Sequence, residues 1–330
     1  MTWTTEEIPD QTGRVAVVTG ANSGLGAATS RELARAGAAV VLACRNIGKG
    51  EEVAAEIRRQ APSSTVEVAE LDLADLTSVR AFAKGLHQER LDLLVNNAGL
   101  MAVPRRETKD GFEMQIGVNH LGHFALTGLL LERLERAPEP RVVTVSSVAH
   151  RTVKGINFDD LNGEKRYFRW TAYGQSKLAN LLFAFELERR AAASGSPLRS
   201  MAAHPGYAAT NLQTRGDGGN GLLTRAEDAL MWVTNRVFAQ SEEMGALPTL
   251  YAATDAGLPG SSYVGPDGKG EQRGHPQLVG TSGAAQDTEA ARRLWELSEQ
   301  LTQVHPALGR EESSGARPTD APGGRPRDGR

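Results

Sequence analysis

The sequence has little cysteine, no long apolar run and no excess of positive charge, and each absence excludes a class of protein. A single cysteine, Cys44, excludes an intrachain disulfide and a cysteine-based metal cluster, and indicates a reducing compartment. No apolar run approaches the roughly 20 residues that cross a bilayer, and the acidic N-terminus lacks a signal peptide's apolar segment. Since 37 Lys and Arg face 40 Asp and Glu, no basic surface for nucleic acid is expected. We therefore expect a cytoplasmic protein without an integral membrane segment or a nucleic-acid partner.

Short apolar runs alternate with amphipathic helical patterns along most of the chain. We predict strands at 15–18, 40–42, 66–68, 91–95, 141–146, 199–203 and 262–264. We predict helices at 25–36, 49–60, 77–88, 111–135, 171–193 and 242–255. Continuously apolar strands that alternate with helices indicate a parallel sheet covered on both faces. The fold class is therefore α/β, a single doubly wound domain with about seven strands and helices on both faces of the sheet.

A glycine-rich turn joins the first predicted strand to the first predicted helix. Glycine lets the backbone approach a pyrophosphate there, and the helix N-terminus supplies amide donors and a partial positive charge. An ordinary tight turn is the alternative, but its place after the first strand of a repeating pattern favours a cofactor site. The turn predicts dinucleotide contacts at Gly20, Asn22, Ser23, Gly24, Leu25 and Gly26.

The residue after the second predicted strand bears on the choice of cofactor. An acidic residue there would accept hydrogen bonds from the ribose of NAD, whereas this chain has Arg45 after Cys44. A guanidinium can pair with a 2′-phosphate and stack on adenine, although a solvated loop arginine is the alternative. We expect NADP(H) to be preferred, with NAD(H) as the second cofactor.

Tyr173 and Lys177 stand four residues apart within a predicted helix, so they share one face. A phenol with a pKa of about 10 is a poor base at neutral pH. A neighbouring ammonium stabilises the phenolate and moves that pKa toward the working range. The pair predicts a proton donor and acceptor.

Other constellations do not predict a site. His120, His123, His150 and His204 have no cysteine or close carboxylate to complete a metal-ligand set, and packing explains the first two better. We therefore expect no metal. The pair Ser146 and Ser147 before His150 lacks the glycine-flanked elbow of a hydrolase.

Together these motifs resemble the short-chain dehydrogenase/reductase family from about residue 13 to about residue 300. The run at 19–26 resembles its glycine signature, and matches follow in family order at Asp72-Leu73, Asn96 to Gly99, Asn119, Ser147, Tyr173 to Lys177 and His204 to Gly206. The runs at 42–46, 145–150 and 176–180 look most like the retinol dehydrogenase and WW-domain oxidoreductase branch, a close relative of light-dependent protochlorophyllide reductase. The chain departs from that branch because no membrane anchor or WW domain precedes the motifs, which leaves the retinoid substrate open.

The resemblance implies further roles. Tyr173 would exchange a proton with the substrate oxygen, Ser147 would hydrogen-bond that oxygen, and Asn119 would support a water relay. Lys177 would also hold the nicotinamide ribose. Implied cofactor contacts are Asp72, Leu73, Asn97, Ala98, Gly99, Tyr173, Lys177, Pro205, Gly206 and Thr210. Family analogy also implies a homo-oligomer formed through the helices near 111–135 and 171–193.

These interpretations divide the chain into an N-terminal extension (1–12), a Rossmann-type NAD(P)-binding catalytic domain (13–305) and a tail (306–330). Residues 207–240 combine a glycine-rich hinge with an apolar helical segment, which is typical of a substrate lid. From residue 309 onward alanine and proline are the only apolar side chains, so disorder is expected. We expect an oxidoreductase of a lipophilic alcohol/carbonyl pair. The alternative is a non-catalytic NAD(P)-sensing protein of the same fold.

Overall fold

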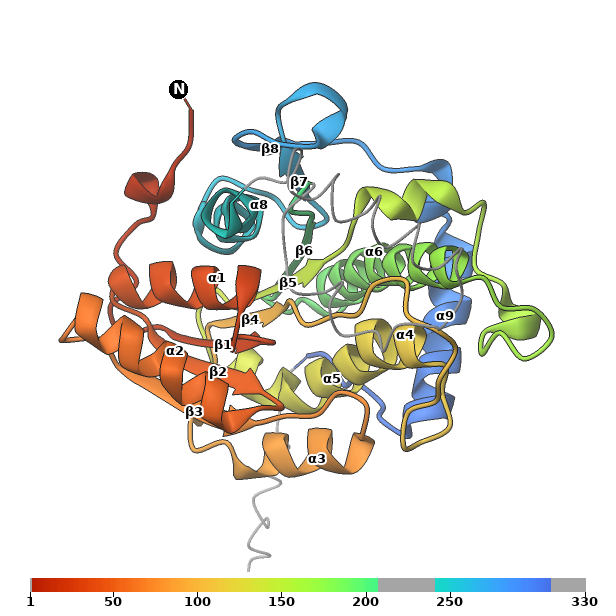
Figure 1. The fold of residues 1–330 in the computed structure, drawn as a ribbon, viewed down its shortest axis with the longest axis horizontal. Helices are drawn as coiled ribbons and strands as arrows, with labels where there is room; N and C mark the ends of the chain where they lie inside the picture. The colour runs from red at the N-terminus through yellow and green to blue at the C-terminus, as the bar shows by residue number, and fades with distance from the viewer. Residues whose placement is uncertain (1, 207–240, 310–330) are drawn as a thin grey trace, which may run out of the picture.

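The computed structural model describes residues 2–206 and 241–309, and its centre is an eight-stranded sheet (Figure 1). The strands are β1 (Val15–Thr19), β2 (Ala39–Cys44), β3 (Val66–Glu70), β4 (Leu93–Asn96), β5 (Arg141–Val145), β6 (Arg199–Ala203), β7 (Tyr263–Pro266) and β8 (Pro276–Leu278). Their order is β3-β2-β1-β4-β5-β6-β7-β8. Neighbouring strands are parallel except for the pair β7 and β8. The strand order reverses at β1, where the carboxyl ends of β1 and β4 leave a crevice for a ligand.

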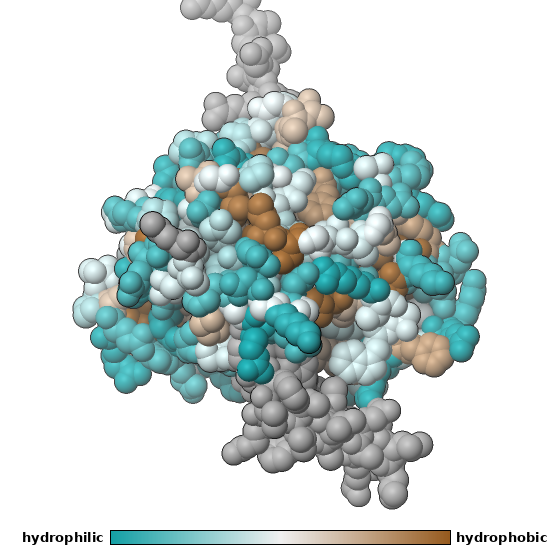
Figure 2. All heavy atoms as spheres, turned by 90° about the horizontal axis from the view of Figure 1, so that it is seen from above, coloured by the Kyte–Doolittle hydropathy of each residue, from teal (hydrophilic) through white to brown (hydrophobic). Residues whose placement is uncertain are grey.

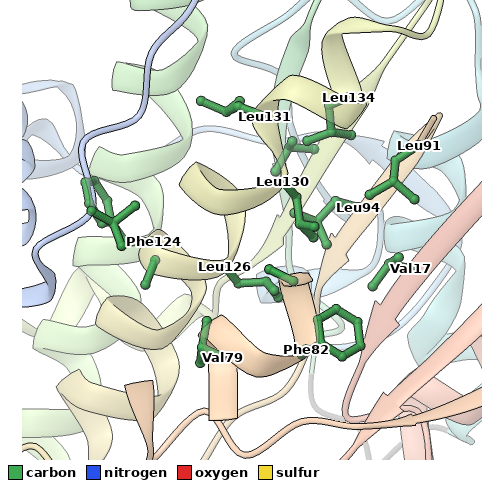
Figure 3. Packing of buried hydrophobic residues seen from close by; sticks show 14 of the residues in the cluster. Val17, Val79, Phe82, Leu91, Leu94, Phe124, Leu126, Leu130, Leu131 and Leu134 are labelled. Carbon is green, nitrogen blue, oxygen red and sulfur yellow. The ribbon is translucent and has the colours of Figure 1, made fainter. Parts of the chain in front are cut away.

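The doubly wound arrangement that the sequence predicts is confirmed, and helices cover both faces of the sheet (Figure 1). The helices are α1 (Gly24–Arg35), α2 (Ile47–Gln60), α3 (Leu76–Gly85), α4 (Met114–Ile116), α5 (Gly122–Glu135), α6 (Arg169–Ser194), α8 (Glu242–Thr254) and α9 (Thr288–Thr302). Val18 of β1 joins the apolar cluster under α1, α2 and α8. Its neighbour Val17 joins the cluster under α3 and α5, which Figure 3 shows from close by. Alternate residues of a strand point to opposite faces of the sheet, and helices cover both faces, so the strands are apolar throughout.

The long helix predicted over 111–135 begins later and is interrupted. Helix α4 starts at Met114, where the Glu113 carboxylate accepts hydrogen bonds from two backbone amides. A π-helical turn over Gly117–Leu121 then separates α4 from α5, and the Gly122 amide donates to the Gly117 carbonyl. Wide turns of this kind are often found at functional sites, and this one contains Asn119.

Helix α9 and strand β8 were not predicted. Strand β8 has only three residues and includes a proline, which suits an edge position. Helix α9 packs against α5 and α6, where the Trp295 ring lies 5.1 Å from Phe124 and 5.9 Å from Phe183, centroid to centroid. Because α9 covers part of α5 and α6, the expected homo-oligomer could form through these two helices only where α9 leaves their surface exposed.

The remaining expectations concern the ends of the domain and its surface. Residues 2–12 contact two helices: the Trp3 ring lies 5.2 Å from that of Tyr251 in α8, and the Gln11 amide donates to the Ala36 carbonyl oxygen at the end of α1. The predicted lid at 207–240 and residues 310–330 of the predicted tail lie outside the described residues. The first residues of that tail, 306–309, are described, and the Gly309 amide donates to Glu135 Oε1 at 3.0 Å. In the part of the chain that is described, no helix is both long and apolar enough to cross a membrane. Figure 2 shows hydrophilic residues over most of one face, with smaller hydrophobic patches between them.

Trp295→Ala should lower the free energy of unfolding by about 3–5 kcal/mol, because it removes a buried aromatic side chain from between α5 and α6. Urea unfolding would measure the change. Gln300→Ala, an exposed change on the same helix, should stay within about 0.5 kcal/mol of the parent. Equal effects for the two variants would mean that α9 does not dock as described.

Candidate active site

Two adjoining hollows lie along the carboxyl ends of the central strands. They share four lining residues, namely Gly20, Ala98, Gly99 and Leu100. The first hollow is also lined by Ser23, Gly24, Leu25, Gly26, Asn97, Val145, Ser146, Tyr173, Lys177 and Pro205. The second also includes Asn22, Cys44, Arg45, Asn46, Lys49, Asp72 and Leu73. Because they share these residues, the two hollows form one continuous groove that reaches from Arg45 to Tyr173.

The glycine turn after β1 forms a cradle that larger side chains would fill. Gly20 has φ +66°, and a Cβ on it would lie 3.0 Å from Ala98. A Cβ on Gly26 would lie 2.5 Å from the Gly20 carbonyl oxygen and 2.6 Å from Asn97 Nδ2. The turn leads into the N-terminus of α1, whose free amides favour an anion. These residues therefore fit a pyrophosphate.

Thr19 joins the glycine turn to the turn after β4. Its Oγ1 accepts hydrogen bonds of 2.9 Å from the backbone amides of both Asn97 and Ala98. Asn97 Nδ2 in turn donates to the Thr19 carbonyl oxygen at 2.8 Å. The Asn97 side chain therefore braces the groove, while the backbone of residues 97–99 lines it.

The second hollow carries two exposed cations at the end of β2. Arg45 makes no ion pair with other residues in the described ranges, and Lys49 lies one helical turn beyond it. Sequence reasoning missed Lys49 because a lysine in the first turn of a helix is an ordinary surface residue. Across the hollow, Asp72 Oδ1 accepts a hydrogen bond from the Ala74 amide at 3.0 Å. That bond fixes the Asp72 carboxylate at the rim of the hollow.

Tyr173 and Lys177 share one face of α6 as predicted, with the ammonium 5.7 Å from the centre of the phenol ring. Lys177 Nζ donates to the Val145 carbonyl oxygen at 3.1 Å. Burial lowers the pKa of Lys177 to about 8. Burial also raises the pKa of Tyr173 to about 12, and a hydrogen bond with Ser147 lowers it only in part. The expected fall of the phenol pKa is thus outweighed by desolvation, and both groups hold their protons at neutral pH.

Ser147, rather than Ser146, faces the phenol. The Ser147 side chain partly offsets the rise in the pKa of the Tyr173 phenol, whereas the buried Ser146 hydroxyl donates to the Lys177 carbonyl oxygen at 2.8 Å. His150 lies 2.7 Å through Nδ1 from the Ser147 carbonyl oxygen, and its Nε2 accepts from the Ser282 amide at 3.2 Å. His150 therefore fixes the Ser147 backbone, a role that sequence reasoning missed because its partner Ser282 is remote in sequence.

Asn119 sits beside the same site, in the π-helical turn. Its Oδ1 accepts from the Leu100 amide at 2.7 Å, and its Nδ2 lies 2.9 Å from both the Leu100 carbonyl oxygen and Ser176 Oγ. A Cβ on Gly99 would lie 3.2 Å from Asn119 Oδ1 and 3.5 Å from Lys177 Nζ. The structure therefore brings the side chains of Asn119 and Lys177 close to the same glycine.

The segment after β6 closes one end of the groove. Pro205 lines the first hollow, and the Gly206 amide donates to Nδ1 of the buried His204 at 3.2 Å. His204 Nε2 lies 3.0 Å from Glu271 Oε2, a contact from the loop between β7 and β8. Thr210 lies outside the described residues.

Comparisons with known proteins agree with this geometry. The family model for the short chain dehydrogenases matches residues 14–218. Retinol dehydrogenase 12 of Mus musculus is 44% identical over 291 residues, which cover 88% of this chain and 86% of that protein.

Solved structures are similar as well. An uncharacterized protein from Mycobacterium paratuberculosis is 51% identical with a TM-score of 0.76, over 93% of this chain and 100% of that one. An NAD(P)-dependent gluconate 5-dehydrogenase from Beutenbergia cavernae, solved with bound NADP, is 29% identical with a TM-score of 0.54, over 74% and 91%. The chain is therefore an oxidoreductase that belongs to the NAD(P)-binding short-chain dehydrogenase/reductase family.

Proposed function

We propose that the protein is an NADP(H)-dependent oxidoreductase of a lipophilic alcohol/carbonyl pair, with Tyr173 as the proton donor and acceptor. The observation that carries the proposal is that Tyr173 and Lys177 line the same hollow as the glycine turn, with the Ser147 side chain acting on the Tyr173 phenol. The nicotinamide, when bound, supplies or accepts the hydride.

The side chains around the Tyr173 phenol move and hold the proton. In carbonyl reduction the protonated Tyr173 phenol donates to the substrate oxygen, and in alcohol oxidation the phenolate takes the proton back. The Lys177 ammonium stabilises the phenolate. Ser147 hydrogen-bonds the same oxygen and Asn119 supports a water relay to Lys177. Burial favours the protonated phenol, which is the form that donates in carbonyl reduction.

NADP(H) is favoured by charge in the second hollow. Arg45 can pair with a 2′-phosphate, and Lys49 adds a second cation on the same rim. An acidic residue that would select the NAD ribose is missing from the position after Cys44.

The lipophilic substrate is supported by the relatives that are named retinol dehydrogenases. Phe168 and Trp170 add exposed aromatic surface at the start of α6, and the Trp170 ring centroid lies 6.3 Å from that of Tyr173. The deciding experiment follows NADPH oxidation with retinaldehyde, straight-chain aldehydes and small polar ketones. Turnover should favour the lipophilic carbonyls. Preference for the small polar ketones would contradict the substrate class, and lack of turnover with all of them would contradict the reaction.

Arg45→Asp should weaken NADP(H) far more than NAD(H), because it replaces a cation that pairs with the 2′-phosphate by a repelling anion. We expect the ratio of the two dissociation constants to change by at least about 10-fold. Arg59→Asp makes the same charge change at an exposed position on α2 and should leave the ratio unchanged. Fluorescence titration with NADPH and with NADH measures the two dissociation constants. If Arg45→Asp raised both by the same factor, Arg45 would not contact the 2′-phosphate.

Tyr173→Phe should lower kcat by about 10²–10⁴-fold because it removes the positioned acid, while the Kd for NADPH changes little. Tyr167→Phe is the matched control, since that phenol donates to the Val103 carbonyl oxygen and should matter for stability alone. Single-turnover kinetics would measure the chemical step. A Tyr173→Phe enzyme with parental single-turnover rates would rule out the mechanism.

The rate of carbonyl reduction should fall as the pH rises through about 8, because the Lys177 ammonium then loses its proton. Below that pH the charge is fully present, so the rate should be flat. Lys177→Arg keeps a cation at every accessible pH and should remove the falling limb, even at a lower absolute rate. The same falling limb in Lys177→Arg would show that another group titrates.

A further inference from the structure

His123 is a buried histidine that the proposed mechanism does not use. It lies on α5 one turn after Asn119, and its side chain contacts two separate parts of the site. Nδ1 is 3.0 Å from the Asn119 carbonyl oxygen, and Nε2 is 2.9 Å from Thr19 Oγ1. The residue is only 1% exposed, so water does not compete for these bonds.

The chemistry of these partners fixes the tautomer of the ring. A carbonyl oxygen only accepts, so His123 Nδ1 carries the hydrogen and donates to Asn119. Burial lowers the pKa of His123 to about 4, and the nearby charge of Lys177 acts in the same direction. The ring is therefore neutral at pH 7, which leaves Nε2 as an acceptor for the Thr19 hydroxyl.

This arrangement uses the full hydrogen-bonding capacity of Thr19. Its hydroxyl donates to His123, and its lone pairs accept from the Asn97 and Ala98 amides. The other acceptor within reach, the Val95 carbonyl oxygen, is farther away at 3.3 Å. His123 thereby orients the hydroxyl that braces the floor of the dinucleotide groove.

We propose that His123 is a positioning residue that links the dinucleotide groove to the catalytic turn, through Thr19 on one side and the Asn119 backbone on the other. Only the expected effect on kcat rests on the proposed function, whereas the effect on NADPH binding and the ring tautomer do not. The Asn119 carbonyl is held by His123 Nδ1 within a turn whose wide, π-helical geometry departs from the regular α-helical ladder.

Three substitutions separate the two bonds. His123→Asn places an amide nitrogen close to the position of Nδ1, so it keeps the bond to Asn119 and loses the one to Thr19. His123→Gln reaches toward Thr19 with its carbonyl oxygen and loses the bond to Asn119. His123→Phe keeps the ring volume and loses both bonds.

The expected results form a crossed pattern. His123→Asn should raise the Kd for NADPH by about 3- to 10-fold with kcat nearly unchanged, because one net hydrogen bond has that size. His123→Gln should lower kcat by a similar factor with Kd nearly unchanged. His123→Phe should do both.

His120 supplies the matched control. It is buried in the same turn, but its Nε2 lies 2.9 Å from Ser298 Oγ of α9 and points away from the groove. His120→Phe should lower the melting temperature without moving Kd or kcat. If His120→Phe reproduces the His123→Phe changes, or if the Asn and Gln variants of His123 behave alike, His123 is a packing residue and the proposal is wrong.

The tautomer gives a test that needs no turnover. Nitrogen-15 spectra of the histidine rings in the full-length protein, assigned by loss of one signal in His123→Phe, should show a protonated Nδ1 and a bare Nε2 at neutral pH. A protonated Nε2 would overturn the proposal. A protein that binds NADPH with this tautomer yet reduces no carbonyl would contradict the proposed function while leaving the link from His123 to the groove in place.

Discussion

The pairing of β1 with β2 on one side and with β4 on the other is the constraint on which the site depends. Parallel register places Val18 of β1 beside Leu42 of β2 and Val95 of β4, so the three strands end at one edge. The backbone of β1 and β4 must then turn away within a few residues of each other. Thr19 stands at that point, and its hydroxyl holds the β4 turn against the glycine turn. The order of the strands places the two turns side by side, and the Thr19 hydroxyl holds them together as the floor of the groove.

Burial, more than charge pairing, sets the protonation of the groups around this edge. It raises the pKa of Tyr173 and lowers the pKa values of Lys177 and His123. Each shift disfavours the charged form, which is the direction that desolvation imposes. The phenol and the histidine are therefore neutral, whereas the Lys177 ammonium keeps its charge beside the phenol. An isolated cation in a dry site acts strongly on a developing phenolate, since little solvent screens it.

The sequence predicted what depends on local spacing and missed what depends on distant contacts. The order of strands and helices, the glycine turn, and the shared face of Tyr173 and Lys177 follow from periodicity and turn chemistry, and the structure contains them. Lys49 was missed because its role depends on a hollow that is also lined by residues following β1, β3 and β4. The π-helical turn was missed because periodicity cannot separate one long helix from two helices in near register. Residues 207–240, where the substrate is expected to be recognised, lie outside the described part of the chain.

Helix α9 shows how a segment without any site motif stabilises the fold around the site. Its Trp295 fills the space between α5 and α6, and its Ser298 meets His120 in the turn that carries Asn119. From the opposite side, His123 ties the same turn to Thr19. The two contacts have different consequences, because His120 joins the turn to α9 and so adds to stability, whereas His123 bonds the Asn119 carbonyl oxygen directly. A wide turn has weaker internal constraints than a regular helix, so the bond from His123 is the one that positions the Asn119 backbone.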